Sequence, residues 1–194
     1  MDDQNARPEY SRQPTLDDLV QLCQHLNEAG ARYVVVGGFA VILNGFTRTT
    51  GDVDLLVDSS SENIVRIKKA LLHLPDQAIR EIDTHEVAKY TVVRVADEIV
   101  VDLMHKACGI TYDDTRDHVQ FYHVAEVRIP FLKPAMLLKT KMTLRPKDAE
   151  DRFFLESLLE VHKTDDLKTS PAKPLAFSPL LGRFWRKLRQ LFLP

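Results

Sequence analysis

Apolar positions recur at helical spacing in several segments of the chain. In the first segment they follow Thr15, a candidate N-cap, and stop before Gly30, a residue typical of helix ends. The buried positions expected in this helix are Leu16, Leu19, Leu22, Cys23 and Leu26. The same period predicts helices over residues 39–43, from the serines at 59–61 to about 73, from Pro134 to about 141, and over 147–162.

Runs rich in β-branched residues predict strands between these helices. We expect them at residues 33–36, 52–57, 78–83, 88–95 and 98–104, with one or two more within 118–131. A turn at 96–98 makes the last two of the named five a hairpin. This order of elements predicts an α/β (α+β) fold with a mixed sheet flanked by helices, followed by C-terminal helices.

Composition and charge divide the chain into unlike parts. Residues 165–194 carry six Lys/Arg and two Asp/Glu, whereas residues 1–164 carry 20 and 26. Polar and proline-bearing stretches mark a loose end and a linker. We therefore divide the chain into a flexible arm at 1–14, a core at 15–132, a C-terminal helical part at 133–163, a linker at 164–177 and a basic amphipathic helix at 178–194.

The basic amphipathic helix combines a broad apolar side with four cationic residues. Its apolar side chains are Leu180, Leu181, Phe184, Trp185, Leu188, Leu191 and Phe192. Docking on a protein surface is the interpretation we prefer, and an anionic membrane surface or an RNA backbone also fits. The acidic remainder of the chain argues against a general coat for nucleic acid, so any RNA contact must be a local patch.

The remaining composition favours a cytoplasmic protein. Cys23 and Cys108 have no metal-ligand spacing and are interpreted as reduced thiols. The first residues lack the apolar region of a signal peptide, and no run reaches transmembrane length.

Asp52 and Asp54 lie two positions apart on a predicted strand. Period-two geometry places both side chains on one face, where they repel each other unless a cation lies between them. A solvated edge strand is the alternative, and it requires no ligand. Asp102 stands in an otherwise apolar strand, so it either faces solvent or joins the same site.

Three carboxylates converge if the strands of Asp54 and Asp102 are neighbours. Mg²⁺ prefers hard oxygen ligands and keeps open positions for phosphate oxygens. We therefore expect Asp52, Asp54 and Asp102 to hold one or two magnesium ions, for which Mn²⁺ can substitute.

Gly37 and Gly38 follow one predicted strand and precede a helix. Glycines at such a point let backbone N–H groups approach phosphate oxygens closely. Arg48 and Thr50 stand shortly before Asp52. Arg48 either contacts a nucleotide or forms an ion pair with Asp52 or Asp54.

This combination resembles a known superfamily. The stretches Gly37-Gly38-Phe39-Ala40-Val41 and Arg48-Thr49-Thr50-Gly51-Asp52-Val53-Asp54-Leu55 resemble the DNA polymerase β-like nucleotidyltransferases, in particular the AbiEii-type toxins of type IV toxin–antitoxin systems. The later block of residues 137–141 and 145–151 is similar to the C-terminal lysine and (R/K)-x-K-D-x-x-D element of the family. The resemblance spans roughly residues 15–160.

The resemblance implies a polymerase β-like core and gives roles to the first matched block. Asp52 and Asp54 would bind metal, and Asp102 would be the third acid and the base for an acceptor hydroxyl. Gly37 and Gly38 would hold the triphosphate, with Arg48 and Thr50 beside the nucleotide.

The second matched block implies a lysine at the phosphates. Lys141 is preferred to Lys139, since the two lie about 200° apart on a helix and only one can face the site. Asp148 and Asp151 would orient this lysine or reach the nucleotide. Acids in the first turn of a helix are also favourable without any ligand.

The sequence therefore predicts an enzyme, a metal-dependent nucleotidyltransferase that moves a nucleoside monophosphate to an acceptor hydroxyl and releases pyrophosphate. RNA or tRNA is the first expected acceptor, within a toxin–antitoxin system that supplies an antitoxin-like partner. A protein-adenylylating enzyme of the antitoxin type and a non-catalytic nucleotide-binding module are the alternatives.

Overall fold

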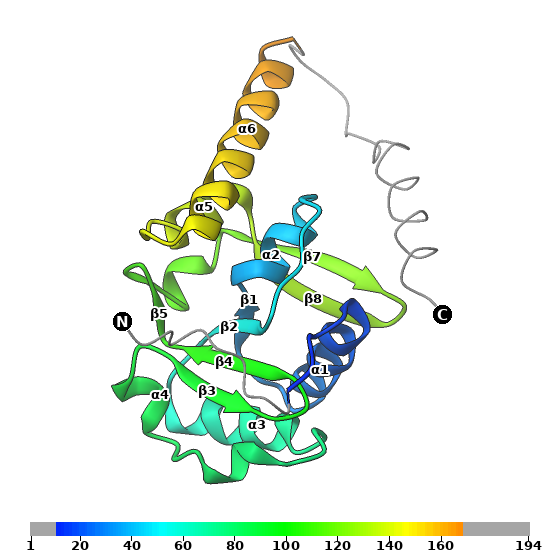
Figure 1. The fold of residues 1–194 in the computed structure, drawn as a ribbon, viewed down its shortest axis with the longest axis vertical. Coiled ribbons are helices and arrows are strands. Elements are labelled where there is room, and N and C mark those ends of the chain that lie inside the picture. Colours follow the sequence, from blue (N-terminus) through cyan, green and yellow to red (C-terminus); the bar gives the residue numbers. More distant parts are fainter. Residues whose placement is uncertain (1–10, 169–194) are drawn as a thin grey trace. The chain divides into compact units, whose positions relative to one another are not determined.

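Six strands form one mixed sheet in the computed structural model, which describes the backbone of residues 11–168 and the side chains of residues 11–161 (Figure 1). The strands are β1 (Tyr33–Val35), β2 (Val53–Val57), β3 (Val93–Ala96), β4 (Val100–Met104), β7 (Val119–Val124) and β8 (Val127–Leu132). Their order is β3-β4-β2-β1-β8-β7, with β2–β4 and β1–β8 parallel and the other pairs antiparallel. This mixed α/β arrangement confirms the predicted fold class.

Helices flank the sheet and account for most of the remaining described chain. They are α1 (Leu16–Glu28), α2 (Gly37–Leu43), α3 (Ser61–Leu71), α4 (Glu86–Lys89), α5 (Pro134–Thr140) and α6 (Pro146–Lys168), with 3-10 turns η1 (Ala78–Glu81) and η2 (Asp113–Thr115) and a small hairpin of β5 (Lys106–Ala107) and β6 (Ile110–Thr111). Helix α1 packs on α3 and β8, and α2 packs on β2 and α5. The chain through Leu159 forms one unit, and the residues from Glu160 belong to a second.

The first helix shows how local chemistry fixes these boundaries. The Thr15 hydroxyl accepts a hydrogen bond from the backbone N–H of Asp18 at 3.3 Å, and the Asp18 carboxylate accepts one from the Thr15 N–H at 2.7 Å. This reciprocal pair satisfies two of the N–H groups that a helix start leaves open. Gly30 then adopts a φ of +65°, which favours glycine after a helix end. Both predicted boundaries are confirmed.

Between α3 and β3 the structure departs from the predicted strands. The strand expected at 78–83 is wrong, because η1 occupies it, and the strand expected at 88–95 begins only at Val93 after α4. Ile79, from the first of these predicted strands, is fully buried from a helical turn instead, as is Val87 in α4. A buried carboxylate from Asp97 takes the place of a strand partner for this backbone.

Asp97 organises this segment from the turn between β3 and β4. Its side chain is fully buried and accepts hydrogen bonds from the backbone N–H groups of Asp76 (3.0 Å), Ala78 (3.0 Å) and Glu98 (2.8 Å). We expect Asp97→Ala to lower the free energy of unfolding by about 2–3 kcal/mol, because three part-buried backbone donors lose a charged acceptor. Urea denaturation measures the loss. Asp97→Asn keeps one acceptor oxygen, so an equal loss in both variants would contradict this role.

The ends of the described chain differ from the expected division. Residues 11–14, expected in the flexible arm, lie against the β3–β4 turn, where the Ser11 hydroxyl donates to the Asp97 carbonyl oxygen at 2.6 Å. Residues 164–168, expected in the linker, continue α6, since no glycine or proline interrupts the helix after Pro146. The rest of the arm and linker, at 1–10 and 169–177, and the basic amphipathic helix at 178–194 lie outside the described residues.

Within residues 11–168, no helix combines the length and the apolar character that crossing a lipid bilayer requires.

Candidate active site

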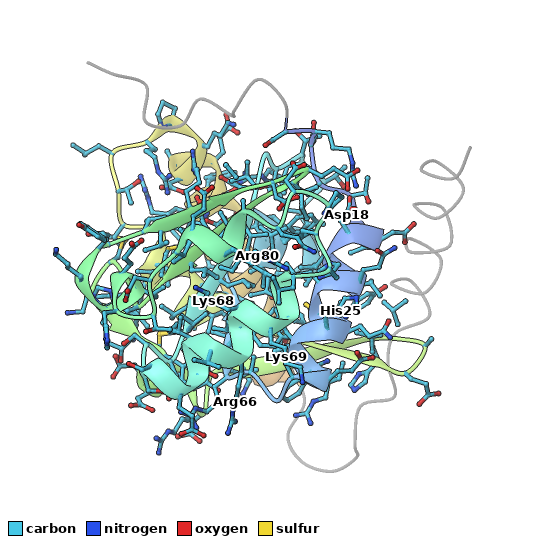
Figure 2. All side chains as sticks on the ribbon, turned by 90° about the horizontal axis from the view of Figure 1, so that it is seen from below. Asp18, His25, Arg66, Lys68, Lys69 and Arg80 are labelled. Carbon is cyan, nitrogen blue, oxygen red and sulfur yellow. The ribbon has the colours of Figure 1, made fainter. Side chains whose placement is uncertain are left out.

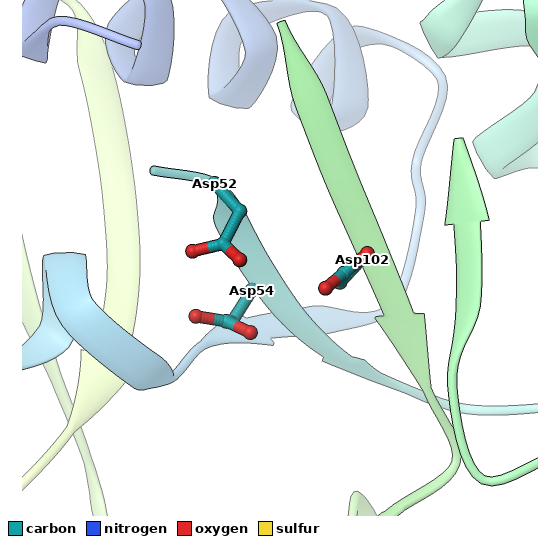
Figure 3. A group of neighbouring side chains, drawn as sticks. All are labelled: Asp52, Asp54 and Asp102. Carbon is teal, nitrogen blue, oxygen red and sulfur yellow. The ribbon is translucent and has the colours of Figure 1, made fainter. Parts of the chain in front are cut away.

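Three carboxylates meet where the parallel strands β2 and β4 lie side by side (Figure 3). Asp54 and Asp102 are direct partners in the strand register, and Asp52 stands just before β2 begins. Each of the three offers an oxygen atom, and these atoms all lie within 4.8 Å of one another. The predicted neighbourhood of the two strands is therefore present, and we call these residues the acidic triad.

The strand that carries Asp54 lies inside the sheet. Strand β2 has β4 on one side and β1 on the other, so the alternative of a solvated edge strand is wrong. Val53, Leu55 and Val57 are buried on the face opposite to Asp54. Asp102 is 4% exposed, so it does not face solvent.

The triad is electrostatically strained without a cation. Burial and the neighbouring charges of Asp52 and Asp102 raise the pKa of Asp54 to about 7, although the charge of Lys141 and a hydrogen bond from the Gly38 N–H act in the opposite direction. A carboxyl that resists ionisation between two like charges marks a place where positive charge is stabilising.

Arg94 supplies part of that positive charge, and sequence reasoning missed it. Its guanidinium donates from Nε to Oδ1 of Asp102 at 2.9 Å and from Nη2 to Oδ2 at 2.8 Å. The same Nη2 lies 3.7 Å from Oδ2 of Asp52. Hydrogen bonding to Asp102 raises the pKa of Arg94, which keeps the guanidinium charged. The predicted hairpin was the only sequence signal near it, and the turn expected at 96–98 would not have placed Arg94 opposite Asp102.

The two glycines allow the backbone to approach the triad closely. Gly37 has a φ of +60°, and a Cβ atom there would lie 1.7 Å from Oδ2 of Asp54. The Gly38 N–H donates to the same oxygen at 3.4 Å, and a Cβ atom on Gly38 would lie 2.3 Å from the Thr50 hydroxyl. Both positions therefore require glycine for contact with the site rather than for the turn alone.

Thr50 is buried beside this backbone. Its hydroxyl lies 3.3 Å from the Asp52 carbonyl oxygen and 3.2 Å from the Asp52 carboxylate. The residue therefore fixes the loop that leads into β2 and orients the first acid of the triad.

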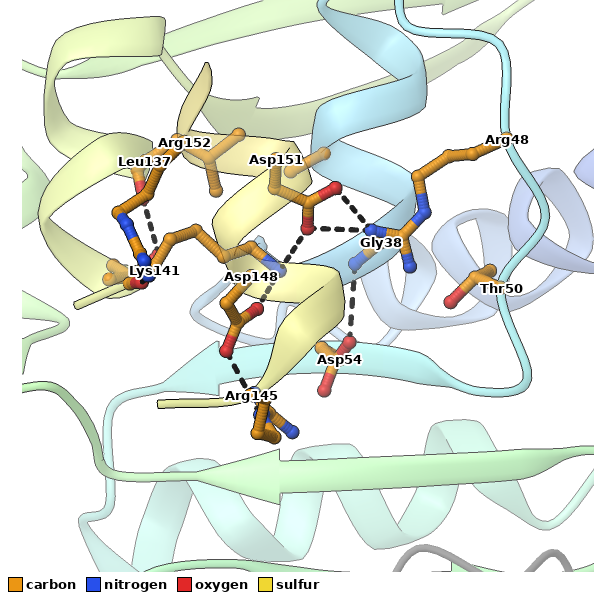
Figure 4. Close-up of polar contacts among 12 residues, drawn as sticks. Gly38, Arg48, Thr50, Asp54, Leu137, Lys141, Arg145, Asp148, Asp151 and Arg152 are labelled. Atoms are coloured by element: carbon orange, nitrogen blue, oxygen red, sulfur yellow. Dashed lines mark hydrogen bonds and ion pairs between the residues drawn. The ribbon is translucent and has the colours of Figure 1, made fainter. Parts of the chain in front are cut away.

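Arg48 has a different partner from the two expected. Its Nη1 donates to both carboxylate oxygens of Asp151, at 2.5 and 2.6 Å, so the expected ion pair with Asp52 or Asp54 is wrong (Figure 4). This pair joins the loop before β2 to helix α6. Sequence spacing could not reveal it, because the two residues are 103 positions apart.

Lys141 lies within a cluster of charged side chains that includes Asp148 and Asp151 (Figure 4). Its Nζ is 2.9 Å from Oδ2 of Asp151 and 3.2 Å from Oδ1 of Asp148, and the side chain is buried. Lys139 is exposed, and no ion pair joins it to a carboxylate among the described residues. The structure thus brings Lys141, and not Lys139, together with Asp148 and Asp151.

Asp148 receives further contacts that the sequence did not indicate. Thr143 donates a short hydrogen bond to it, and Nε of Arg145 lies 2.9 Å from its Oδ2. Burial raises the pKa of Asp148, but these hydrogen bonds and the charge of Lys141 outweigh burial and lower it. The carboxylate is therefore held ionised as a partner for Lys141.

Asp151 holds two cations while itself only 1% exposed. We expect Asp151→Asn to lower the free energy of unfolding by about 3 kcal/mol, because Arg48 and Lys141 would keep their charges with fewer partners. The control is Asp113→Asn, whose ion pair with Arg116 is exposed on both sides and is worth about 1 kcal/mol or less. Chemical denaturation of both variants compares the two losses, and equal losses would contradict the buried role of Asp151.

The donor set of the acidic triad fits a divalent cation. Carboxylate oxygens are hard ligands of the kind that Mg²⁺ and Mn²⁺ bind. Burial and the repulsion by Asp52 and Asp102 raise the pKa of Asp54, and a bound cation would offset both effects. Asp52, Asp54 and Asp102 are the residues that would hold it.

Comparison with known proteins adds one structural likeness. No protein-family model and no curated protein matches the chain. Among solved structures, the fold is similar to that of a "putative nucleotidyltransferase" from Thermotoga maritima, with 19% identity and a TM-score of 0.43, over 79% of this chain and 89% of that protein. What the site can do therefore follows from its own geometry.

Proposed function

We propose that the protein is a metal-dependent nucleotidyltransferase that moves a nucleoside monophosphate from a triphosphate to an acceptor hydroxyl. The observation that carries this proposal is the acidic triad, whose oxygens converge beside Gly37 and Gly38. Clustered carboxylates alone indicate a cation. Their position next to a close-approaching backbone and a buried lysine favours a cation shared with phosphates.

In the proposed reaction, the acceptor oxygen forms a bond to the α-phosphorus of the triphosphate while the bond from that phosphorus to the β-phosphate bridging oxygen breaks. Pyrophosphate leaves with the electron pair of the broken bond. Asp102 receives the proton of the acceptor hydroxyl. Lys141 offsets negative charge that develops on the phosphates, and Asp148 and Asp151 hold its ammonium group in place.

Mg²⁺ or Mn²⁺ bound by the acidic triad would neutralise phosphate charge and orient the triphosphate. The Gly38 N–H contacts Asp54 and the Thr50 hydroxyl contacts Asp52, so two of the three carboxylates have a neighbour that orients them before any ligand arrives. Such preorganisation lowers the reorganisation that the reaction requires.

The acceptor that we propose first is RNA, with tRNA as the leading example. A local group of basic residues on α3 and η1 offers a place for a phosphate backbone (Figure 2). Arg66 and Lys68 of this group already donate to carbonyl oxygens of the fold, while Lys69 and Arg80 are exposed. In this role the protein acts as the toxin of a toxin–antitoxin pair.

A protein hydroxyl is the second acceptor class. The net charge of −6 over residues 1–164 favours it, since an acidic surface repels RNA and tolerates a basic protein. In this role the protein modifies a partner protein, as an antitoxin-type nucleotidyltransferase would.

A transfer assay tests the proposal and separates the two acceptors. Purified protein is incubated with each α-labelled nucleoside triphosphate, Mg²⁺ or Mn²⁺, and either total RNA or a protein extract. We expect label on an acceptor, release of pyrophosphate and loss of both when the metal is chelated. Label on protein alone would exclude RNA. Failure of the triphosphate to bind in the presence of metal would exclude the proposed nucleotidyltransferase activity.

A further inference from the structure

Arg94 occupies ligand atoms that the proposed cation needs. Both oxygens of Asp102 accept hydrogen bonds from its guanidinium, at 2.9 and 2.8 Å, and its Nη2 also lies 3.7 Å from Asp52. Asp102 is thus engaged at both oxygens by a side chain of the same protein, whereas among residues 11–161 Asp54 accepts only the long bond from Gly38. A cation that approaches Asp102 therefore meets a positive group already in place.

The charges of the site lead to the same competition. The acidic triad carries three negative charges when ionised, and the guanidinium of Arg94 already offsets one of them. A divalent ion and a guanidinium a few ångströms apart repel each other strongly where water is scarce. Binding of a cation to Asp102 and retention of both Arg94 hydrogen bonds therefore oppose each other.

Arg94 also lines a cavity that it shares with two acidic residues. Strand β3 is the edge strand of the sheet, and Arg94 lines a cavity of about 520 Å³ along it, together with Asp76 and Glu81. Both acids are exposed at the rim of this cavity. The long side chain can turn from Asp102 toward these carboxylates without leaving solvent contact, since 27% of it is already exposed.

We propose that Arg94 is a built-in counter-ion that competes with the divalent cation for Asp102 and turns toward the cavity of Asp76 and Glu81 when the cation binds. The inference rests on the proposed function, because it requires a cation at the acidic triad. Arg94 is a positioning residue that acts through Asp102. In the metal-free protein its positive charge offsets the repulsion among the three carboxylates. Its competition with the cation raises the metal concentration that binding requires.

Titration with Mn²⁺ in the absence of nucleotide, followed by electron paramagnetic resonance of the free ion, tests the competition. We expect Arg94→Gln to bind Mn²⁺ about tenfold more tightly than the wild type, which corresponds to about 1.4 kcal/mol. Arg94→Lys keeps the charge and should stay near the wild-type affinity. In an Asp102→Asn background, Arg94→Gln should change the affinity much less, because the carboxylate for which the two cations compete is gone and only the longer contact of Arg94 with Asp52 is left.

A measurement on the wild-type protein guards against a variant that fails to fold. The Arg94 Nε–H resonance, assigned by its absence in Arg94→Lys, should shift when Mg²⁺ is added, because its acceptor changes. Tighter binding in Arg94→Gln or a shifted resonance supports the inference. An unchanged or weaker affinity in a folded Arg94→Gln, or an unmoved resonance in a wild type that binds Mn²⁺, overturns it and leaves the proposed function standing. Absence of Mn²⁺ binding by the wild type overturns both.

Discussion

Asp54→Asn is expected to abolish nucleotide transfer while making the metal-free protein more stable. The substitution removes a central ligand of the acidic triad, and charge stabilisation by a metal is worth several kcal/mol, so the rate should fall by about a thousandfold or more. The amide also removes a carboxyl that resists ionisation beside Asp52 and Asp102. The melting temperature in chelator should therefore rise by several degrees.

The pH dependence of this stability difference has a defined sign. The pKa of Asp54 is raised to about 7 in the folded protein, above its ordinary value near 4 in the unfolded chain. The folded state thus loses stability as the pH rises from about 4 to about 7, and the full penalty is present above that range. The advantage of Asp54→Asn should be small near pH 4 and largest near pH 8.

Thermal unfolding with and without Mg²⁺ measures this prediction. Wild-type protein should gain stability from Mg²⁺ at pH 8, and Asp54→Asn should gain much less, since ligand binding to the folded state raises its apparent stability. A variant that is equally stabilised by Mg²⁺, or whose advantage does not change between pH 4 and pH 8, would contradict the assignment of Asp54.

Gly37→Ala is expected to disable the site through a steric conflict with Asp54. The new Cβ would lie 1.7 Å from Oδ2 of Asp54, so the carboxylate or the backbone must move. A displacement of about 1 Å at a reacting centre can cost about a hundredfold in rate. We therefore expect a loss of at least that size in transfer, together with weaker Mn²⁺ binding.

Gly30→Ala is the matched control for Gly37→Ala. Gly30 has a φ of +65°, close to the +60° of Gly37, and its added Cβ would meet only the end of the Arg66 side chain at 3.8 Å. Both variants bear the strain of a left-handed residue, roughly 1–2 kcal/mol, but only Gly37→Ala disturbs the triad. Equal effects of the two variants on Mn²⁺ affinity would show that backbone strain alone explains the loss.

Local patterns predicted the helices and the central pair of acids. The ends of the first helix could be predicted from Thr15 and Gly30, because capping chemistry acts over a few residues. Asp52 and Asp54 share a face because strand geometry alternates side chains. The neighbourhood of Asp54 and Asp102 required one further step, the parallel pairing of β2 and β4, which their apolar flanks made reasonable.

Long-range side-chain partners and the exact register of paired strands could not be predicted from the sequence. A turn centred on Asp97 would have set Val92 opposite Asp102, whereas the loop spans Asp97 to Ile99 and places Arg94 there. A shift of the turn by one position therefore decides whether an arginine reaches the triad. The strand predicted at 78–83 was wrong for a related reason. The Ala78 N–H donates to the Asp97 carboxylate, and the N–H groups of Arg80 and Ile82 donate to carbonyl oxygens of the local turn, so these groups do not pair with another strand.

The pair of Arg48 with Asp151 has a consequence for how the site arises during synthesis. It closes a loop of 103 residues, and the same carboxylate anchors Lys141. A nascent chain can form β1, β2 and the triad strands long before Asp151 leaves the ribosome. Until then Arg48 and Lys141 lack this anchor, and the charged groups around the triad are not fixed. Chains that end before Asp151 would therefore carry the acids without this anchor for Arg48 and Lys141, so that the order of translation delays the assembly of a complete site until Asp151 has been synthesised.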